Sequence, residues 1–280
     1  MRIKASGITD VGLKREGNED SFSTEDSLGL YIVADGMGGH VAGEVASRIA
    51  VEMINKSFQK WVAEKTSENE LFGLPDSSLS LWGNYILSSI RMANKIVYEL
   101  AVEHKHYHGM GTTIVILFIT PTLIICANVG DSRIYMVRDG KLERLSKDHS
   151  FVAEQVEMGL MTEEEGETSH MKHILTRNFG SAEDVEPDIF EIEPNNNDRF
   201  VLCTDGLTDQ VDDEEILEMT KNEDDPDILC RKFIDTVLKR GAHDNTTIVS
   251  VFLADMKKPR MGSLRKIGLF LSGLVKLSNK

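Results

Sequence analysis

Seven runs of apolar and β-branched residues, each bounded by turn residues, constrain the fold more than any other feature of this sequence. The runs cover residues 3–9, 28–34, 113–119, 122–128, 133–137, 199–204 and 246–253. Their length and composition are typical of β-strands. Two short connections, Thr120-Pro121 and the type I′ turn pair Asp139-Gly140, join runs that follow one another closely. Because short turns join antiparallel neighbours, we predict a largely antiparallel sheet.

Three further segments have the spacing of amphipathic helices. Apolar residues recur every third or fourth position within 42–58, 86–101 and 229–238, and Pro226 is suited to the first turn of the third helix. Long helices between groups of strands, without regular βαβ alternation, predict an α+β sandwich rather than a doubly wound parallel sheet. The polar segment 66–80 is predicted to be a loop, and 149–188 a long insertion beside the functional site.

Four aspartates stand where apolar runs end or begin: Asp35, Asp131, Asp205 and Asp244. A single Asp-Gly pair is an ordinary turn. Four carboxylates at the rim of a core, however, require positive charge. Since no His-rich or Cys-rich spacing accompanies them, the oxygen donors favour Mg²⁺ or Mn²⁺ over zinc. Two cations that share one carboxylate are suited to activating water against a phosphoryl centre.

Arg15 precedes the carboxylate of Asp20 by five residues in a glycine-containing segment. Taken alone, this spacing is that of a surface ion pair. Beside the aspartates it indicates a phosphate clamp, because a guanidinium group matches two phosphate oxygens at once.

Six motifs in order carry a family resemblance: TDVGLKREGNED, VADGMGGH, MGTT, ANVGDSRIY, CTDGL and HDNTT. Together they resemble the metal-dependent protein phosphatases of type 2C (the PPM family), particularly the bacterial branch, over about residues 5–254. The resemblance implies a four-layer α-β-β-α sandwich of two antiparallel sheets flanked by helices. It also implies hydrolysis of phosphoserine and phosphothreonine on proteins by a water that bridges two Mn²⁺ or Mg²⁺ ions.

The resemblance assigns metal ligands by motif. It implies that Asp35 bridges both metals and that the backbone carbonyl of Gly36 binds the second. Asp205 and Asp244 would complete the protein ligands of the first metal. Asp131 would join Asp205 at a third, weaker metal position.

The same resemblance assigns the surrounding roles. Arg15 would bind the phosphate, Glu19 and Asp20 would hold metal-bound waters, and Asn245 would support the ligand loop. Eukaryotic members place a histidine general acid directly after the Asp-Gly pair, where this chain has Met37. The leaving oxygen is then protonated either by water, which we favour, or by His40 from the following turn.

Alternative functions are less consistent with the residues. An aspartyl-phosphate hydrolase of the haloacid dehalogenase type requires Asp-x-Asp at a strand end, but Val33 and Cys203 stand two residues before Asp35 and Asp205. A non-catalytic phosphoprotein-binding regulator would be expected to have lost metal aspartates. A small phosphorylated metabolite stays open as the substrate. For the phosphatase, the expected partners are phosphorylated proteins, including a cognate Ser/Thr kinase and its substrates.

The charge distribution divides the chain into a catalytic domain, 1–255, with a flap at about 149–188, and a basic tail, 256–280. The net charge is −15, and the tail carries seven basic residues and no acidic ones, so residues 1–255 carry −22. This acidity argues against nucleic-acid binding. The tail has an apolar helical stripe, so we expect it to dock on a partner or on the acidic body in preference to anionic membrane.

The three cysteines form no CxxC pair, and the chain starts without the apolar core of a signal peptide. We therefore expect reduced thiols and a soluble, cytoplasmic, monomeric protein.

Overall fold

The computed structural model describes residues 1–39 and 41–255, which form two antiparallel β-sheets. The first sheet has the strand order β1 (Arg2–Asp10), β11 (Thr246–Ala254), β10 (Arg199–Cys203), β7 (Arg133–Arg138) and β8 (Lys141–Arg144). The second has the order β2 (Asp20–Glu25), β3 (Leu30–Met37), β5 (Ile114–Ile119), β6 (Ile124–Val129) and β9 (Asp188–Ile192), with β4 (Gly111–Thr112) paired to β3. Every pairing is antiparallel, as predicted.

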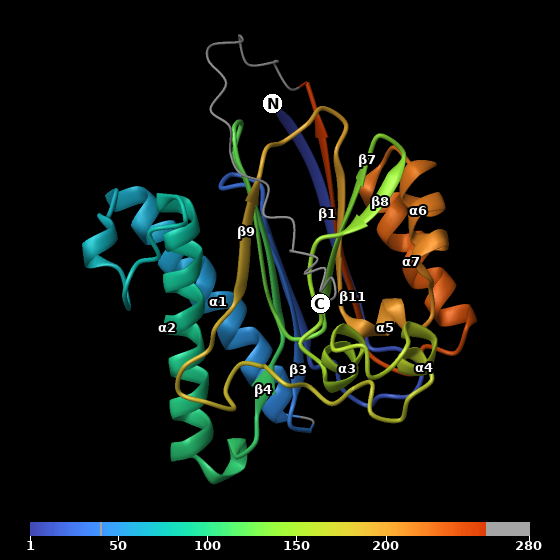
Figure 1. Ribbon diagram of the computed structural model, residues 1–280, viewed down its shortest axis with the longest axis horizontal. Coiled ribbons are helices and arrows are strands. Elements are labelled where there is room, and N and C mark those ends of the chain that lie inside the picture. The colour runs from blue at the N-terminus through green and yellow to red at the C-terminus, as the bar shows by residue number, and fades with distance from the viewer. Residues whose placement is uncertain (40, 256–280) are drawn as a thin grey trace, which may run out of the picture.

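Helices cover the outer face of each sheet (Figure 1). The second sheet packs against α1 (Val41–Glu64) and α2 (Leu81–Glu103), and the first against α6 (Asp213–Lys221) and α7 (Pro226–Lys239). Three short helices gather at one end: α3 (Phe151–Glu157), α4 (Glu163–Glu167) and α5 (Asp205–Thr208). Two short 3₁₀ turns, η1 (Glu68–Glu70) and η2 (Lys105–Tyr107), follow α1 and α2. The predicted α+β sandwich is confirmed.

The central strands are apolar throughout because both of their faces are buried. On β3, Tyr31 and Val33 face the other sheet, whereas Leu30 and Ile32 face α1 and α2. All four side chains are fully buried. Alternation along a strand sends neighbouring side chains to opposite faces, so the middle strands of a sandwich need apolar residues at every position.

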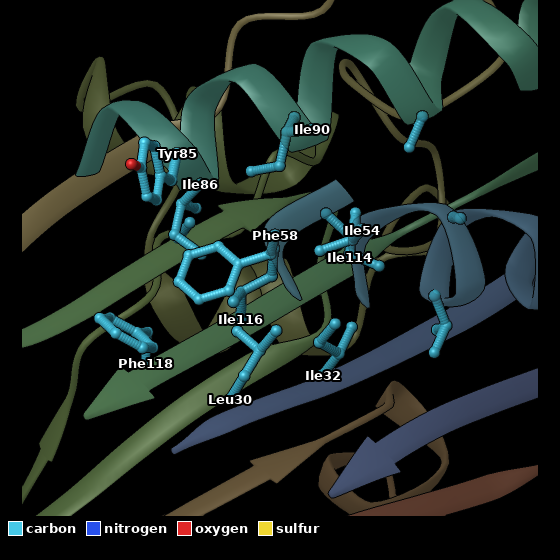
Figure 2. Packing of buried hydrophobic residues seen from close by; sticks show 14 of the residues in the cluster. Leu30, Ile32, Ile54, Phe58, Tyr85, Ile86, Ile90, Ile114, Ile116 and Phe118 are labelled. Carbon is cyan, nitrogen blue, oxygen red and sulfur yellow. The ribbon is translucent and has the colours of Figure 1, made fainter. Parts of the chain in front are cut away.

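Aromatic packing joins α1 and α2 to the second sheet. The ring of Phe58 lies between the strands and α2 (Figure 2), with its centroid 4.8 Å from that of Phe118 and 6.0 Å from that of Tyr85. Trp61 and Trp82 pack around the same cluster. The aromatic residues of each helix are three positions apart, and this spacing places them on the helix face that packs against the sheet.

Several elements were not predicted from the sequence. β2 alternates serine with larger residues, and β9 is only partly buried at a sheet edge, so neither has a strong apolar pattern. The short helices α3, α5 and α6 were also missed. Thr162 caps α4, because its hydroxyl accepts a hydrogen bond from the amide of Glu165. The turn at Asp139-Gly140 has positive φ angles of 53° and 75°, as a type I′ turn requires.

All three cysteines are free and buried. Among the described residues, no helix combines the length and apolar character needed to cross a membrane. His40, the alternative to water as general acid, and the basic tail, which we expect to dock on a partner or on the acidic body, lie outside the described residues.

Candidate metal and phosphate site

The predicted aspartates gather where the ends of the two sheets meet. Asp35 lies on β3 directly opposite Asp20 of β2. Asp205 is the first residue of α5, just after β10, and Asp244 stands two residues before β11. The carboxylates are close enough to interact: burial, followed by the charges of Asp20, Asp205, Asp131 and Asp244, raises the pKa of Asp35 well above its usual value.

Asp20 is held by hydroxyl groups from the opposite sheet. Its Oδ2 accepts hydrogen bonds from the side chains of Thr204 (3.0 Å) and Thr247 (2.7 Å). Its Oδ1 is buried and has no hydrogen-bond partner. Burial is the main reason that the pKa of Asp20 rises to about 7, and the nearby aspartates raise it further. The CTDGL and HDNTT motifs therefore contain threonines that position an acidic group far away in sequence.

The backbone of Asp35 is fixed by the MGTT segment. Its carbonyl oxygen accepts hydrogen bonds from the Thr112 hydroxyl and the Thr113 amide, both 2.8 Å long. Its own amide donates to the Thr113 hydroxyl over 3.1 Å. Thr113 in turn shares a 2.7 Å hydrogen bond with the hydroxyl of Ser132, one residue after Asp131. Three motifs are thus connected by short polar contacts.

The glycines that follow Asp35 and Asp205 are required for close packing. A Cβ on Gly36 would lie 2.2 Å from the Gly43 carbonyl oxygen of α1. A Cβ on Gly206 would lie 2.0 Å from the Asn245 carbonyl oxygen. A side chain at position 36 would push α1 away from β3, and one at position 206 would push α5 away from Asn245. Glycine is therefore needed at both positions for close backbone approach.

Arg15 reaches the aspartates from the loop between β1 and β2. Its Nη2 donates a 2.6 Å hydrogen bond to Oδ2 of Asp244. The loop is held in place by Asn245, whose side-chain amide donates to the carbonyl oxygens of Val11 and Gly17 and accepts from the amide of Glu19. About half of the Arg15 side chain is exposed, so its guanidinium group is accessible to a ligand at the mouth of the site.

Asp131 follows β6 and completes the cluster. Burial and the charge of Asp205 raise its pKa to about 7. Like Asp20, Asp205 has a buried carboxylate oxygen, Oδ1, without a hydrogen-bond partner. Closely packed carboxylates with raised pKa values and unpartnered oxygens need cations, and oxygen donors suit Mn²⁺ and Mg²⁺. The residues therefore fit a divalent metal centre.

The 149–188 segment lies beside this cluster and supplies a residue that sequence reasoning missed. A cleft of about 970 Å³ separates α3 and α4 from α5 and α6, and Asp131 and Asp205 lie on its wall. From the same segment, His173 Nδ1 lies 3.3 Å from Oδ2 of Asp205. No periodicity marks His173 in the sequence, because the contact depends on how the segment folds back over α5.

Comparisons with known proteins agree with this geometry. The profile of the family described as Protein phosphatase 2C matches residues 8–246. A serine/threonine phosphatase stp of Listeria welshimeri is 33% identical over 91% of this chain and 98% of its own length.

Solved structures are similar over most of the chain. A serine/threonine phosphatase of S. agalactiae is 36% identical, with a TM-score of 0.78 over 90% of this chain and 100% of that one. The catalytic domain of the serine threonine protein phosphatase PstP, solved with 2 manganese ions, is 30% identical, with a TM-score of 0.75 over 90% of this chain and 99% of that one.

Proposed function

Because this chain belongs to the protein phosphatase 2C family and is a metal-dependent Ser/Thr protein phosphatase, we propose that its aspartate cluster is the catalytic metal centre. Asp35 would be shared by two cations, with the backbone carbonyl of Gly36 as a further ligand of one of them. Asp205 and Asp244 would complete the ligands of the other. The observation that carries this proposal is the carboxylate cluster itself: Asp35 lies opposite Asp20, and the buried Oδ1 atoms of Asp20 and Asp205 have no hydrogen-bond partner.

The cations would be Mn²⁺ or Mg²⁺, with a third, weaker position between Asp131 and Asp205. When bound, they neutralise the phosphoryl oxygens and provide an activated water for in-line attack. The remaining steps depend on the residues of the chain. Asp20 and Glu19 orient water at the site, and the two threonine hydroxyls that contact Asp20 keep its carboxylate in place. Because Met37 occupies the histidine position of eukaryotic relatives, water would protonate the leaving oxygen.

We assign phosphate binding to Arg15. Its contact with Asp244 positions the guanidinium group beside the metal ligands, and its remaining N–H groups can donate to phosphate oxygens. Asn245 supports this arrangement because it ties the Arg15 loop to the start of β11.

Replacing Arg15 with alanine is expected to lower kcat/KM for a phosphopeptide by roughly 10- to 100-fold, since charge-assisted hydrogen bonds contribute about 1.5–3 kcal/mol each. Arg15→Lys should recover only part of the loss, because an ammonium group cannot form the bidentate contact. The matched control is Arg48→Ala, which removes an exposed guanidinium group paired with Glu44 on α1. Steady-state kinetics with unchanged kcat/KM in Arg15→Ala would contradict the assignment.

The substrates are phosphorylated proteins, and we propose that they include a Ser/Thr kinase and the targets of that kinase. A panel of phosphoserine and phosphothreonine peptides, compared with small phosphate esters, tests this substrate class. Phosphate release is expected to be faster from the peptides, to require Mn²⁺ or Mg²⁺, and to stop when EDTA is added. Preferred hydrolysis of the small esters would indicate a metabolite phosphatase, and metal uptake without turnover would indicate a non-catalytic regulator.

A further inference from the structure

His149 is the first residue of the flap, the 149–188 segment, and its side chain is buried, with 4% exposed. The chain folds back onto this position further along the flap. The amide of Thr176 donates to the carbonyl oxygen of His149 over 2.9 Å, and the amide of Phe151 donates to that of Ile174 over 2.8 Å. Residues 149–151 and 174–176 therefore form a flap base, and α4 and most of α3 lie between its two stretches.

His149 makes two hydrogen bonds to Gly130, the residue before Asp131. Its backbone amide donates to the Gly130 carbonyl oxygen over 2.9 Å, and the Gly130 amide donates to Nδ1 of its ring over 3.1 Å. One residue of the flap thus satisfies both polar backbone groups of Gly130. Because a backbone N–H can only donate, Nδ1 carries no proton, and the ring proton is on Nε2.

The protonated Nε2 faces the other end of the flap. It lies 3.3 Å from Oδ2 of Asp188, the first residue of β9. Nη1 of Arg177 lies 3.2 Å from Nε2 and donates to Oδ1 of the same carboxylate over 3.0 Å. The hydrogen bond from His149 is the main reason that the pKa of Asp188 is lowered. One ring therefore connects both ends of the flap to Gly130.

Gly130 in turn contacts the segment that holds Asp35. Its φ is 106°, and a Cβ at this position would lie 2.6 Å from Cβ of Thr113, so the two residues are in close contact. The amide of Thr113 donates to the Asp35 carbonyl oxygen, and its hydroxyl accepts from the Asp35 amide. A shift of Gly130 would move Asp131 directly and would disturb Asp35 through Thr113.

We propose that His149 is a positioning residue for the phosphatase reaction: its ring and backbone amide fix Gly130 and thereby hold Asp131 in place. Through Thr113, the same contact steadies Asp35. The inference rests on the proposed function, because both aspartates belong to the proposed metal centre. His149 acts on the rate of turnover and not on substrate binding, since a misplacement of about 1 Å can lower a rate by on the order of a hundredfold.

Two substitutions separate the roles of the ring nitrogens. In His149→Asn, the side-chain oxygen can replace Nδ1 as the acceptor for the Gly130 amide, whereas the contact of Nε2 is lost. In His149→Gln, the longer side chain can reach Asp188, but no acceptor remains in the place of Nδ1. For a phosphopeptide, we expect kcat of the asparagine variant within about threefold of the wild type. We expect kcat of the glutamine variant to fall by roughly 10- to 100-fold, with KM changed by less than about threefold.

The matched control is His170→Gln, which changes an exposed histidine of the same flap and should keep wild-type kinetics. Circular dichroism checks the fold of each variant. Asparagine and glutamine variants of His149 with the same kcat, whether high or low, would overturn the proposal, because the role assigned to Nδ1 requires them to differ.

Nitrogen-15 NMR of the full-length wild type with Mg²⁺ tests the same contact without a substitution. Long-range correlation spectra distinguish the two tautomers of a histidine ring, and the signals of His149 are those that are absent from His149→Asn. We expect the proton on Nε2, and a proton on Nδ1 would overturn the proposal. Wild-type protein without phosphopeptide turnover would contradict the proposed function, whereas normal turnover in both the wild type and His149→Gln would contradict only the role of His149.

Discussion

Asp35→Asn protein is expected to lose at least about a thousandfold of its phosphopeptide turnover at saturating Mn²⁺ while it keeps its fold. Asparagine has nearly the same shape as aspartate but lacks the charge that two cations would share. Electrostatic groups of this kind contribute about 4 kcal/mol or more to transition-state stabilisation, and each 1.36 kcal/mol corresponds to a factor of ten in rate. The backbone contacts of Asp35 with Thr112 and Thr113 do not involve its carboxylate, so they should survive.

The control for this result is Asp139→Asn. Asp139 stands in the turn between β7 and β8 with a φ of 53°, a conformation that asparagine adopts readily. This variant makes the same chemical change away from the site and should retain wild-type turnover. Circular dichroism of both variants would check folding. Turnover of Asp35→Asn within a few-fold of the wild type would show that Asp35 is not a shared metal ligand.

The second large effect concerns stability. Mn²⁺ at about 100 times its dissociation constant should stabilise the wild type by about 2.7 kcal/mol, which corresponds to a rise in Tm of roughly 5–10 °C. In EDTA, Asp35→Asn should melt at a higher temperature than the wild type, because the substitution removes one charge from a buried group of mutually repelling carboxylates. The same variant should lose most of the Mn²⁺-dependent rise.

The pH dependence of the metal-free protein follows from the same charges. The pKa values of Asp20 and Asp131 are raised to about 7 in the folded protein, above the value of about 3.9 for unfolded aspartate. Folding therefore favours the protonated forms, and the free energy of unfolding in EDTA should fall as pH rises from about 4 to about 7. Differential scanning fluorimetry across this range measures the trend.

The stabilisation by Mn²⁺ has its own control. An Asp35→Asn variant whose Tm rises with Mn²⁺ as much as that of the wild type, beside an Asp139→Asn control that matches the wild type, would contradict a shared ligand at Asp35.

Much of the framework can be predicted from local sequence. The apolar run of β3, the helical spacing of α1 and the Asp139-Gly140 turn each have a pattern that the structure confirms. The aspartates at strand ends were also recognisable, because carboxylates at the rim of a core are costly without a ligand. By contrast, β2 and β9 have weak patterns, since one alternates small polar residues and the other lies at a sheet edge.

By itself, the sequence determined the antiparallel strands, the covering helices, the family and the acidic residues that form the cluster. Only the tertiary structure decided how these residues meet. Asp20 is held by Thr204 and Thr247, which lie 184 and 227 residues away in sequence, and His173 reaches Asp205 because the flap folds over α5. Periodicity records which face of one element is buried, whereas these contacts depend on the packing of one sheet on the other and of the flap on α5.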